Sequence, residues 1–337
     1  MKRFLSKKII FTAIALFGAV PLLFAWGAWG HQHINRAAVF ALPAPMRTFF
    51  YNHLDFITEE AVVPDLRKYT INDKAEFNRH FIDLEAYGDN AVQSLPKTAT
   101  EAKAQFNAET LEDNGILPWY IQEMTEKLTQ AFKAKRKSEI LFLAADLGHY
   151  IADAHMPLHT SINHDGQATN QRGIHAFWES QLPEMFGGTY NLNAGEARYI
   201  EDITAETWNI IAHSNSLADS LLQVELQLKN TYPEAQIYDK DSVGAVAKNK
   251  YNQPMHTQAY AAEYHKRLRG MVERQMRQAI AETASYWYTA WVNAGRPDLS
   301  GLDPESLTKR NKKFLKQDLK LWEKQGKVRN VTSEAEF

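Results

Sequence analysis

The chain has 337 residues, of which 45% are hydrophobic and 23% are charged. This composition supports one large domain or two small ones with a sizeable core, and it excludes wholesale disorder. The formal net charge of −2 argues against a general polyanion-binding protein, although a local cluster of metal ions can override the net sign. Because the chain contains no cysteine, a disulfide framework and a lipoprotein attachment site are excluded.

The first 25 residues have the features of a targeting segment. A basic start precedes an apolar run over residues 9–24, which is short for a membrane span and ends before the small residue Ala25. We predict a signal peptide over residues 1–25, removed after Ala25, and a mature protein that is periplasmic or secreted. An uncleaved N-terminal anchor is the alternative. Cleavage removes four cations and no acid, which takes the formal charge from −2 to about −6.

The mature chain shows apolar residues at helical spacing and no convincing alternation of the kind that strands need. We therefore predict an all-α protein, with one helical-bundle domain over residues 26–297. Ser138 is expected to cap a strongly apolar central helix that ends near Ala154. The predicted helices cover residues 32–40, 101–112, 119–134, 138–154, 174–182, 203–229 and 257–294, and residues 164–173 read as a polar loop.

Residues 298–337 form a basic C-terminal tail in which cations are interleaved with apolar residues. One interpretation is a basic amphipathic helix that makes a peripheral contact with an anionic membrane. The other, which we favour, is a terminal helix packed on the body with a solvated charged face. The cations concerned are Lys309, Arg310, Lys312, Lys313, Lys316, Lys320, Lys324 and Lys327.

The stretch LAADLGHYIADAHMPLH, residues 143–159, carries the clearest chemical signal. His149 and Asp153 are spaced i, i+4, so a helix presents both side chains on one face. Pro157 breaks or kinks that helix, and His159 lies just beyond the break. Two imidazoles and a carboxylate at one helix end suit zinc. A lone H-x-x-x-D pair is more often a surface ion pair, so the rest of the chain must decide.

Other segments supply similar donors. His175 and Glu179 repeat the i, i+4 spacing in the sequence HAFWE, while Asp65 precedes His80 by fifteen positions and His31 follows soon after the predicted cleavage point. A zinc site needs such histidines and carboxylates on separate segments that can converge. Several clusters in one cysteine-free chain are harder to dismiss than a single pair.

Trp26 becomes the N-terminal residue if the signal peptide is cut after Ala25. Its free α-amine and its carbonyl oxygen can then chelate a metal ion, with His31 as a further ligand. Cleavage after Ala28 would place bulky Trp26 at a position that prefers a small residue. The alternative is that Trp26 is only a core aromatic residue.

The order of these residues resembles a known family. The pattern W-x4-H, an aspartate, HFID, H-x3-D-x5-H and H-x3-E is similar to that of the trinuclear zinc phosphoesterases, which include zinc-dependent phospholipase C and single-strand-specific zinc nucleases. The resemblance implies three Zn²⁺ ions per chain at the base of a cleft between helices. It implies one zinc on Asp65, His80, His149 and Asp153, a second on His159, His175 and Glu179, and a third on Trp26, His31 and the far oxygen of Asp153.

The resemblance also implies a reaction. Close zinc ions lower the pKa of a shared water, and the resulting hydroxide attacks phosphorus in line. Asp65 would orient that water or act as general base. Lys68, or Arg67 beside it, stands where the nuclease branch has a cation that stabilises the phosphate, although either residue can equally be an ordinary surface cation.

Phe81 and Asp83, in the HFID motif, are the expected substrate contacts. Phe81 would stack on a base or line a head-group pocket, with a plain core phenylalanine as the alternative. Asp83 follows the ligand His80 by three positions and resembles a carboxylate that contacts the ligand shell or the substrate.

The substrate class is less determined than the reaction. Glu179, where the nucleases carry aspartate, and the short gap between His159 and His175 favour a phospholipase C-like phosphodiesterase. The W-x4-H spacing and the cation after Asp65 favour the alternative, a single-strand-specific endonuclease or 3′-nucleotidase. A second alternative is a non-catalytic, zinc-stabilised envelope protein. The expected partner is a phospholipid head group or a single-stranded nucleic acid, with no obligate protein partner evident.

Overall fold

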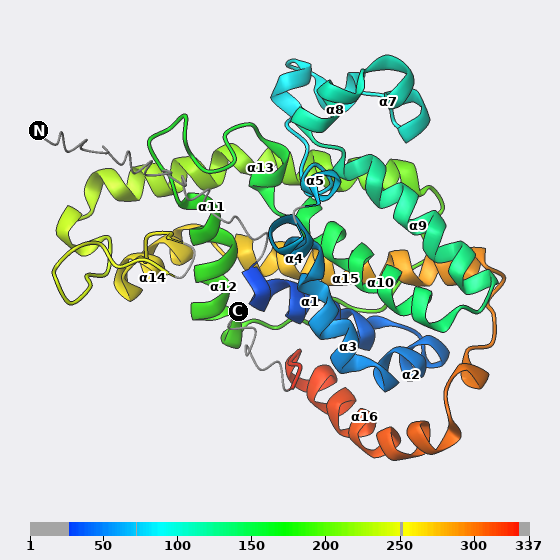
Figure 1. Cartoon of the computed structure of the whole chain (residues 1–337). Coiled ribbons are helices and arrows are strands. Elements are labelled where there is room, and N and C mark those ends of the chain that lie inside the picture. Colours follow the sequence, from blue (N-terminus) through cyan, green and yellow to red (C-terminus); the bar gives the residue numbers. More distant parts are fainter. Residues whose placement is uncertain (1–26, 72, 250–251, 330–337) are drawn as a thin grey trace, which may run out of the picture.

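Four helices cross at the centre of the protein and form its core (Figure 1). In the computed structural model, which describes residues 27–71, 73–249 and 252–329, the indole of Trp287 donates a hydrogen bond to the carbonyl of Ala144 at 2.8 Å and so joins two of these helices. Phe50 stacks on the same indole at a centroid distance of 5.0 Å. The four helices are α1 (Gly27–Ala41), α9 (Leu117–Lys133), α10 (Lys137–Ala154) and α15 (Met271–Asn293).

The remaining helices surround this core. Helices α7 and α8 project from one end of the bundle, and α16 runs along the opposite edge beside α2 (Figure 1). The surrounding helices are α2 (Ala44–Asn52), α3 (Leu54–Glu59), α4 (Val63–Thr70), α5 (Lys74–Phe77), α6 (Ala91–Ser94), α7 (Ala99–Gln105), α8 (Ala108–Asn114), α11 (Ile174–Ala176), α12 (Leu182–Phe186), α13 (Ile203–Thr231), α14 (Gln258–Arg267) and α16 (Glu305–Gln325).

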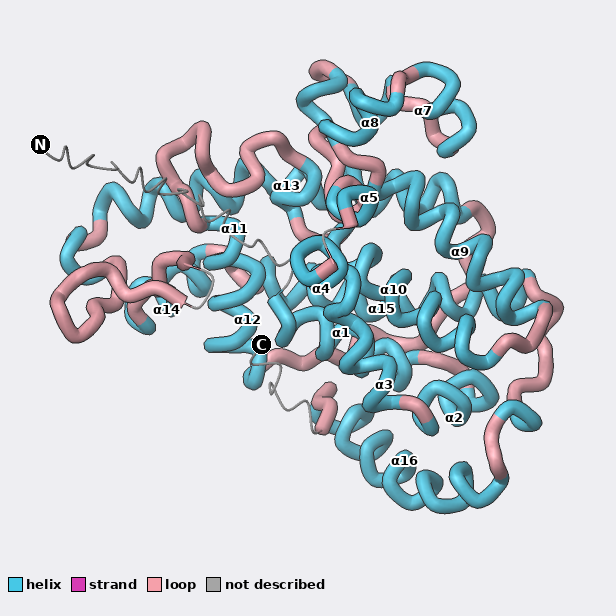
Figure 2. Tube along the Cα trace, in the orientation of Figure 1, coloured by secondary structure: helices cyan, strands magenta, loops and turns pink. Residues whose placement is uncertain are grey.

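The all-α prediction is confirmed. Figure 2 shows helices joined by loops, and the β-type pairings among the described residues are three isolated bridges within residues 238–256. No helix in the described ranges combines the length and the apolar character that a membrane span requires. The predicted signal peptide lies outside the described residues, and the division at residue 297 stays a prediction.

Two predicted helices are each divided in the structure, for local reasons. The helix expected over 101–112 is interrupted at Phe106, which is extended, and Asn107 caps α8 by accepting a hydrogen bond from the backbone of Thr110 at 2.7 Å. The helix expected over 257–294 breaks between α14 and α15 because Gly270 adopts a left-handed conformation with φ of 77°. Apolar periodicity continues across both breaks and therefore hides them.

The start of α10 also differs from the prediction. The residue at the N-cap is Arg136, which makes no side-chain cap, and Ser138 lies inside the first turn, so the predicted Ser138 cap is wrong. The other end of α10 agrees with the sequence: the helix ends at Ala154, and Pro157 opens a 3-10 turn that carries His159.

Helix α10 approaches α1 closely where Gly148 faces Asn35. The side-chain amide of Asn35 donates to the carbonyl of Ala145 at 3.0 Å, and a Cβ at position 148 would lie 2.1 Å from Asn35 Oδ1. Asn35 is fully buried, so it has little room to move. The missing side chain at position 148 therefore sets the distance between the two helices that carry His31 and His149.

Gly148→Ala should lower the free energy of unfolding by about 1–3 kcal/mol, because the new methyl group displaces Asn35 and breaks its hydrogen bond. Urea unfolding monitored by circular dichroism measures this. In an Asn35→Ala background the same substitution should be less destabilising, since the clash is removed. Equal destabilisation in both backgrounds would contradict this account of the close approach.

Candidate metal centre

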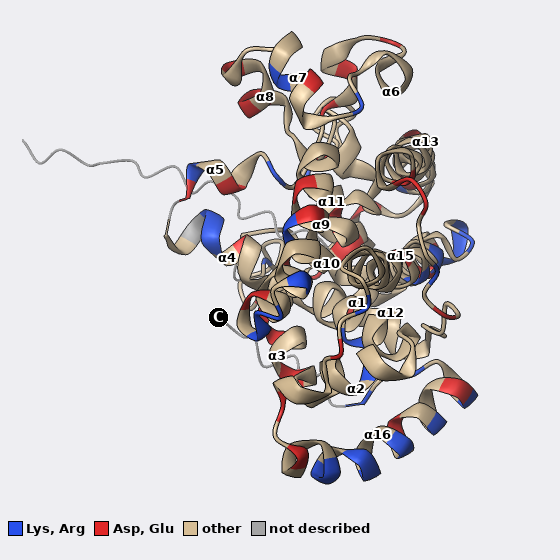
Figure 3. Ribbon diagram, turned by 90° about the vertical axis from the view of Figure 1, so that its right-hand side faces the viewer, with Lys and Arg blue, Asp and Glu red and all other residues tan. Residues whose placement is uncertain are grey.

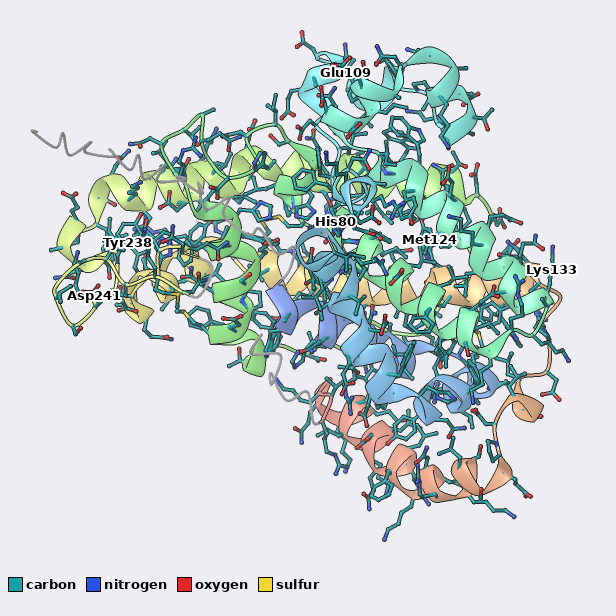
Figure 4. All side chains as sticks on the ribbon, in the orientation of Figure 1. His80, Glu109, Met124, Lys133, Tyr238 and Asp241 are labelled. Atoms are coloured by element: carbon teal, nitrogen blue, oxygen red, sulfur yellow. The ribbon has the colours of Figure 1, made fainter. Side chains whose placement is uncertain are left out.

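Eight of the nine predicted ligands converge in the structure, and they come from segments far apart in the sequence. Figure 4 places His80 in the middle of the molecule. The ninth, Trp26, lies outside the described residues. The converging residues are His31 on α1, Asp65 on α4, His80 after α5, His149 and Asp153 on α10, His159 in the turn after Pro157, His175 on α11 and Glu179 in the π-helical turn Phe177–Gln181.

The donors form three groups, and in each group the possible ligand atoms lie within 4.8 Å of one another. All eight residues are at most 6% exposed. The first two groups share His149, and the carboxylate of Asp153 lies close to His31, His80 and His159. The groups are His31 with His149 and Asp153, Asp65 with His80 and His149, and His159 with His175 and Glu179.

The hydrogen bonds of His159 and His175 fix which ring nitrogen points into the centre. The Nδ1 of His159 donates to the carbonyl of His80 at 2.7 Å, and the Nδ1 of His175 donates to the carbonyl of His164 at 2.8 Å. A neutral imidazole that donates from Nδ1 carries a lone pair on Nε2. The two Nε2 atoms lie 3.2 Å apart, and Glu179 raises the pKa of His175 to about 9, so a proton bridges this pair in the absence of metal and a divalent cation would replace it.

The same pattern occurs around Asp153. The Nδ1 of His149 donates to the carbonyl of Ala61 at 2.8 Å, which leaves a lone pair on its Nε2, 3.1 Å from Nδ1 of His80. A carboxylate oxygen of Asp153 lies 2.8 Å from that nitrogen of His80. Imidazole nitrogens and a carboxylate oxygen therefore converge on one buried point, which is the arrangement of a metal site.

Asp153 and His31 add further acceptors to this region. Within the described residues, Oδ1 of Asp153 and both ring nitrogens of His31 are buried without a hydrogen bond, although Nε2 of His31 lies 3.4 Å from that oxygen. Burial alone would raise the pKa of Asp153, but the imidazoles of His149 and His159 hold it well below its usual range. A buried anion among imidazoles is a suitable ligand for a divalent cation.

The donor set fits zinc. Imidazole nitrogens and carboxylate oxygens without thiolates are ligands that Zn²⁺ accepts, and backbone carbonyls hold the far nitrogens of His149, His159 and His175, as is usual around this metal. A cavity of about 470 Å³ is lined by Arg79, the neighbour of His80 in the chain, and by none of the eight described donors.

The comparison with protein families agrees with this geometry. The model of the S1/P1 nucleases matches residues 26–285, which is most of the chain. The chain belongs to the S1/P1 nuclease family. No individual curated protein matches it. The protein is therefore a zinc-dependent phosphoric ester hydrolase, and its cofactor is three zinc ions, the number used by this family and matched by the three donor groups.

The S1/P1 match favours nucleic acid as the substrate. The sequence had favoured a phospholipase C-like activity, chiefly because Glu179 replaces an aspartate, and that preference is not supported. The side chain of Glu179 reaches His175 at 3.1 Å, so the longer carboxylate keeps its place in the donor group. The residue type at this position therefore carries little information about the substrate.

The structure distinguishes the two candidate cations of α4. The ammonium of Lys68 lies 2.6 Å from Oδ1 of Asp65, with both side chains nearly buried. Arg67 points elsewhere, to Glu76 at 3.0 Å and Asp146 at 2.7 Å. Burial would raise the pKa of Asp65, but Lys68 and the nearby imidazoles hold it below its usual range. Lys68, rather than Arg67, is therefore the cation of α4 that lies next to Asp65.

Phe81 and Asp83 lie on an extended segment next to the centre. The carbonyl of Phe81 accepts a hydrogen bond from Leu117 at 3.2 Å, and the backbone of Asp83 donates to Asn114 at 2.8 Å. Phe81 is half-buried and meets the exposed ring of Phe77 edge to face at 5.9 Å. Burial, and secondarily the charge of Glu85, raises the pKa of Asp83 to about 7.

Sequence reasoning missed Glu76, which lies behind the centre. Glu76 is fully buried on α5, and its carboxylate lies 3.3 Å from Nε2 of His80, the nitrogen that points away from the other donors. It also accepts hydrogen bonds from Tyr150, from Arg67 at 3.0 Å and from Arg79 at 2.9 Å. Burial would raise the pKa of Glu76, but these contacts hold it below its usual range. The i, i+4 spacing of Glu76 and His80 was the available signal.

Glu76→Gln should weaken zinc binding by about 10–100-fold, because His80 loses the carboxylate that fixes its orientation and strengthens it as a ligand. Competition with a chromophoric chelator measures the affinity and the number of zinc ions bound. The matched control is Asp146→Asn, which removes the other carboxylate partner of Arg67 but makes no hydrogen bond to His80. Similar losses in the two variants would show that Glu76 acts only through the stability of α4 and α5.

Proposed function

We propose that the protein is a single-strand-specific endonuclease and 3′-nucleotidase that is exported and acts in the periplasm or outside the cell. The observation that carries this proposal is the position of Phe81 and Asp83, which follow the donor His80 directly in a chain of the S1/P1 family. An aromatic ring and a carboxylate beside a phosphoester-hydrolysing centre suit a nucleobase, which offers a face for stacking and an edge for hydrogen bonds.

We assign the ligands as the sequence pattern implies. One zinc is held by Asp65, His80, His149 and Asp153, a second by His159, His175 and Glu179, and a third by Trp26, His31 and Asp153. Convergence of the eight described donors supports this assignment. Bound zinc lowers the pKa of water and withdraws charge from a phosphate, which is the chemistry that phosphodiester hydrolysis needs.

The protein side chains have separate roles in the proposed reaction. Asp65 accepts a proton from the attacking water, and Lys68 with the nearby imidazoles keeps its carboxylate ionised for that task despite burial. The ammonium of Lys68 stabilises the charge that develops on the phosphate oxygens. Phe81 stacks on a base and Asp83 contacts its edge, so these two residues act on binding and not on the chemical step.

The proposed substrate class is tested by incubating the mature, zinc-loaded protein with single-stranded DNA and with phosphatidylcholine in parallel. We expect chelator-sensitive degradation of the DNA and no release of phosphocholine, because the residues beside the centre suit a base. Chelator-sensitive release of phosphocholine alone would refute the nuclease proposal. Duplex DNA of the same length is the control for strand specificity.

The roles of Lys68 and Phe81 can be separated kinetically. Lys68→Gln should lower kcat/KM by about 100-fold on every phosphodiester, because it removes a charge that acts on the transition state. Phe81→Ala should lower kcat/KM on single-stranded DNA by about tenfold through KM, and leave hydrolysis of bis-p-nitrophenyl phosphate unchanged.

Two controls accompany these variants: Lys74→Gln, an exposed cation on α5, and Phe142→Ala, an exposed ring on α10. Neither should change the kinetics. If Phe81→Ala slowed both substrates equally, the ring would be structural and its role in base binding would be excluded.

A further inference from the structure

Helix α16 has an apolar face that is already covered by the body of the protein. Trp322 is only 4% exposed, and its ring stacks on Phe40 at 5.8 Å. Asp318 accepts a hydrogen bond from the hydroxyl of Tyr51 at 2.7 Å, and Leu319 packs against the core. This packing agrees with the interpretation of the tail as a terminal helix on the body, and it leaves only the opposite face of α16 for a partner.

That opposite face is strongly basic. Figure 3 shows cations along the outer side of α16, and all of them are exposed. Among the ion pairs within the described residues, Lys309 is the one cation of this face with a carboxylate partner, Glu305 at 2.8 Å. We define the basic face of α16 as Lys309, Arg310, Lys312, Lys313, Lys316, Lys320 and Lys324.

The positive charge is concentrated on this helix. Helix α16 has seven basic and three acidic residues, a net charge of +4, whereas the mature chain as a whole is acidic. The helix also lies beyond residue 285, where the family match ends. A local positive surface on an acidic protein attracts polyanions to one place and orients them there.

The spacing of the cations suits an extended polyanion. Lys309, Lys313, Lys316, Lys320 and Lys324 follow one another at intervals of three or four residues, so they form one stripe along the helix. Successive charges are separated by about 5–6 Å along the helix axis, and the stripe extends over about 20 Å. A strand laid along the stripe can therefore place several phosphates against cations.

A cavity of about 490 Å³ lies at the flank of this stripe, between α16 and the α2–α3 region. Arg310 and Phe314 line it from α16, whereas its other guanidinium groups, those of Arg36 and Arg329, are paired with Asp55 at 3.1 Å and Asp318 at 2.8 Å. The ring of Phe314 is 56% exposed. Cations beside an exposed aromatic ring are the combination that single-stranded nucleic acids use, with phosphates on the charges and a base on the ring.

We propose that the basic face of α16, together with Phe314, is an accessory binding site for single-stranded nucleic acid. The proposal rests on the nuclease function proposed above. Figure 1 shows α16 at the edge of the molecule, and Trp322 meets α1 at Phe40, nine residues along that helix from the donor His31, so only a strand that covers this separation reaches both sites. Binding at α16 raises the effective concentration of the rest of that strand near the centre. A membrane is a poorer partner, because the apolar face that would insert into lipid is buried against the body.

The test uses the zinc-loaded full-length mature protein and the variant Lys313→Glu/Lys316→Glu/Lys320→Glu. For single-stranded DNA of about 40 nucleotides we expect KM at low salt to rise by about tenfold, and the slope of log affinity against log salt to become shallower by about 2. A thymidine dinucleotide is too short to reach α16, so its kinetics should not change. The charge-matched control replaces the exposed lysines Lys240, Lys248 and Lys266 by glutamate and should behave like the wild type.

A binding measurement separates this proposal from the nuclease function. Fluorescence anisotropy with a slowly cleaved phosphorothioate oligothymidylate should show weaker binding to the α16 variant, and about five-fold weaker binding to Phe314→Ala. If the protein bound this probe through α16 but cleaved no DNA, the accessory site would stand and the nuclease proposal would fail. If the α16 variant bound the probe as the wild type does, the accessory site would be refuted. If the α16 variant lost binding to phosphatidylserine vesicles but still bound the probe, the accessory site would be overturned in favour of a membrane contact.

Discussion

The structure depends on the convergence of metal-binding side chains in a buried space. Imidazole nitrogens face each other at about 3 Å, and ionised carboxylates lie among them. Such an arrangement is unfavourable in a protein interior unless cations neutralise it. The surrounding fold keeps the donors in place: backbone carbonyls hold the far nitrogens of His149, His159 and His175, and a carboxylate performs this task for His80.

The helices that supply these donors are also those that build the core. Helix α10 carries two of the donors and lies against α1, α9 and α15, so its position is fixed by the same apolar packing that stabilises the protein. Gly148 serves both the packing of the core and the placement of the donors, because the absence of a side chain lets α1 approach α10 beside His149. Metal binding and folding are therefore coupled through the geometry of one helix crossing.

Charged side chains have different surroundings at the centre and on α16. At the centre, buried charges are paired within hydrogen-bonding distance, and the network of Glu76, Arg67, Arg79 and Asp146 continues this pairing towards the surface. On α16 the charges are exposed and mostly without carboxylate partners within the described residues, which leaves them available to a polyanion. The paired charges at the centre hold the metal ligands in place. The exposed charges of α16 attract a polyanionic substrate, and salt weakens this attraction.

The sequence alone determined the all-α class, the donor residues of α10 and the turn after it, and the trinuclear resemblance. These properties follow from local spacing: i, i+4 pairs lie on one helix face, and Pro157 ends a helix wherever the chain folds. Tertiary structure decided the rest. Only packing showed that Lys68 and not Arg67 faces Asp65, and that Glu76 supports His80, because both depend on which side chains of α4 and α5 meet α10. Likewise, the helices break at Asn107 and Gly270 although the apolar periodicity continues across both positions. The periodicity depends on which residues are buried, whereas the break depends on the backbone conformation.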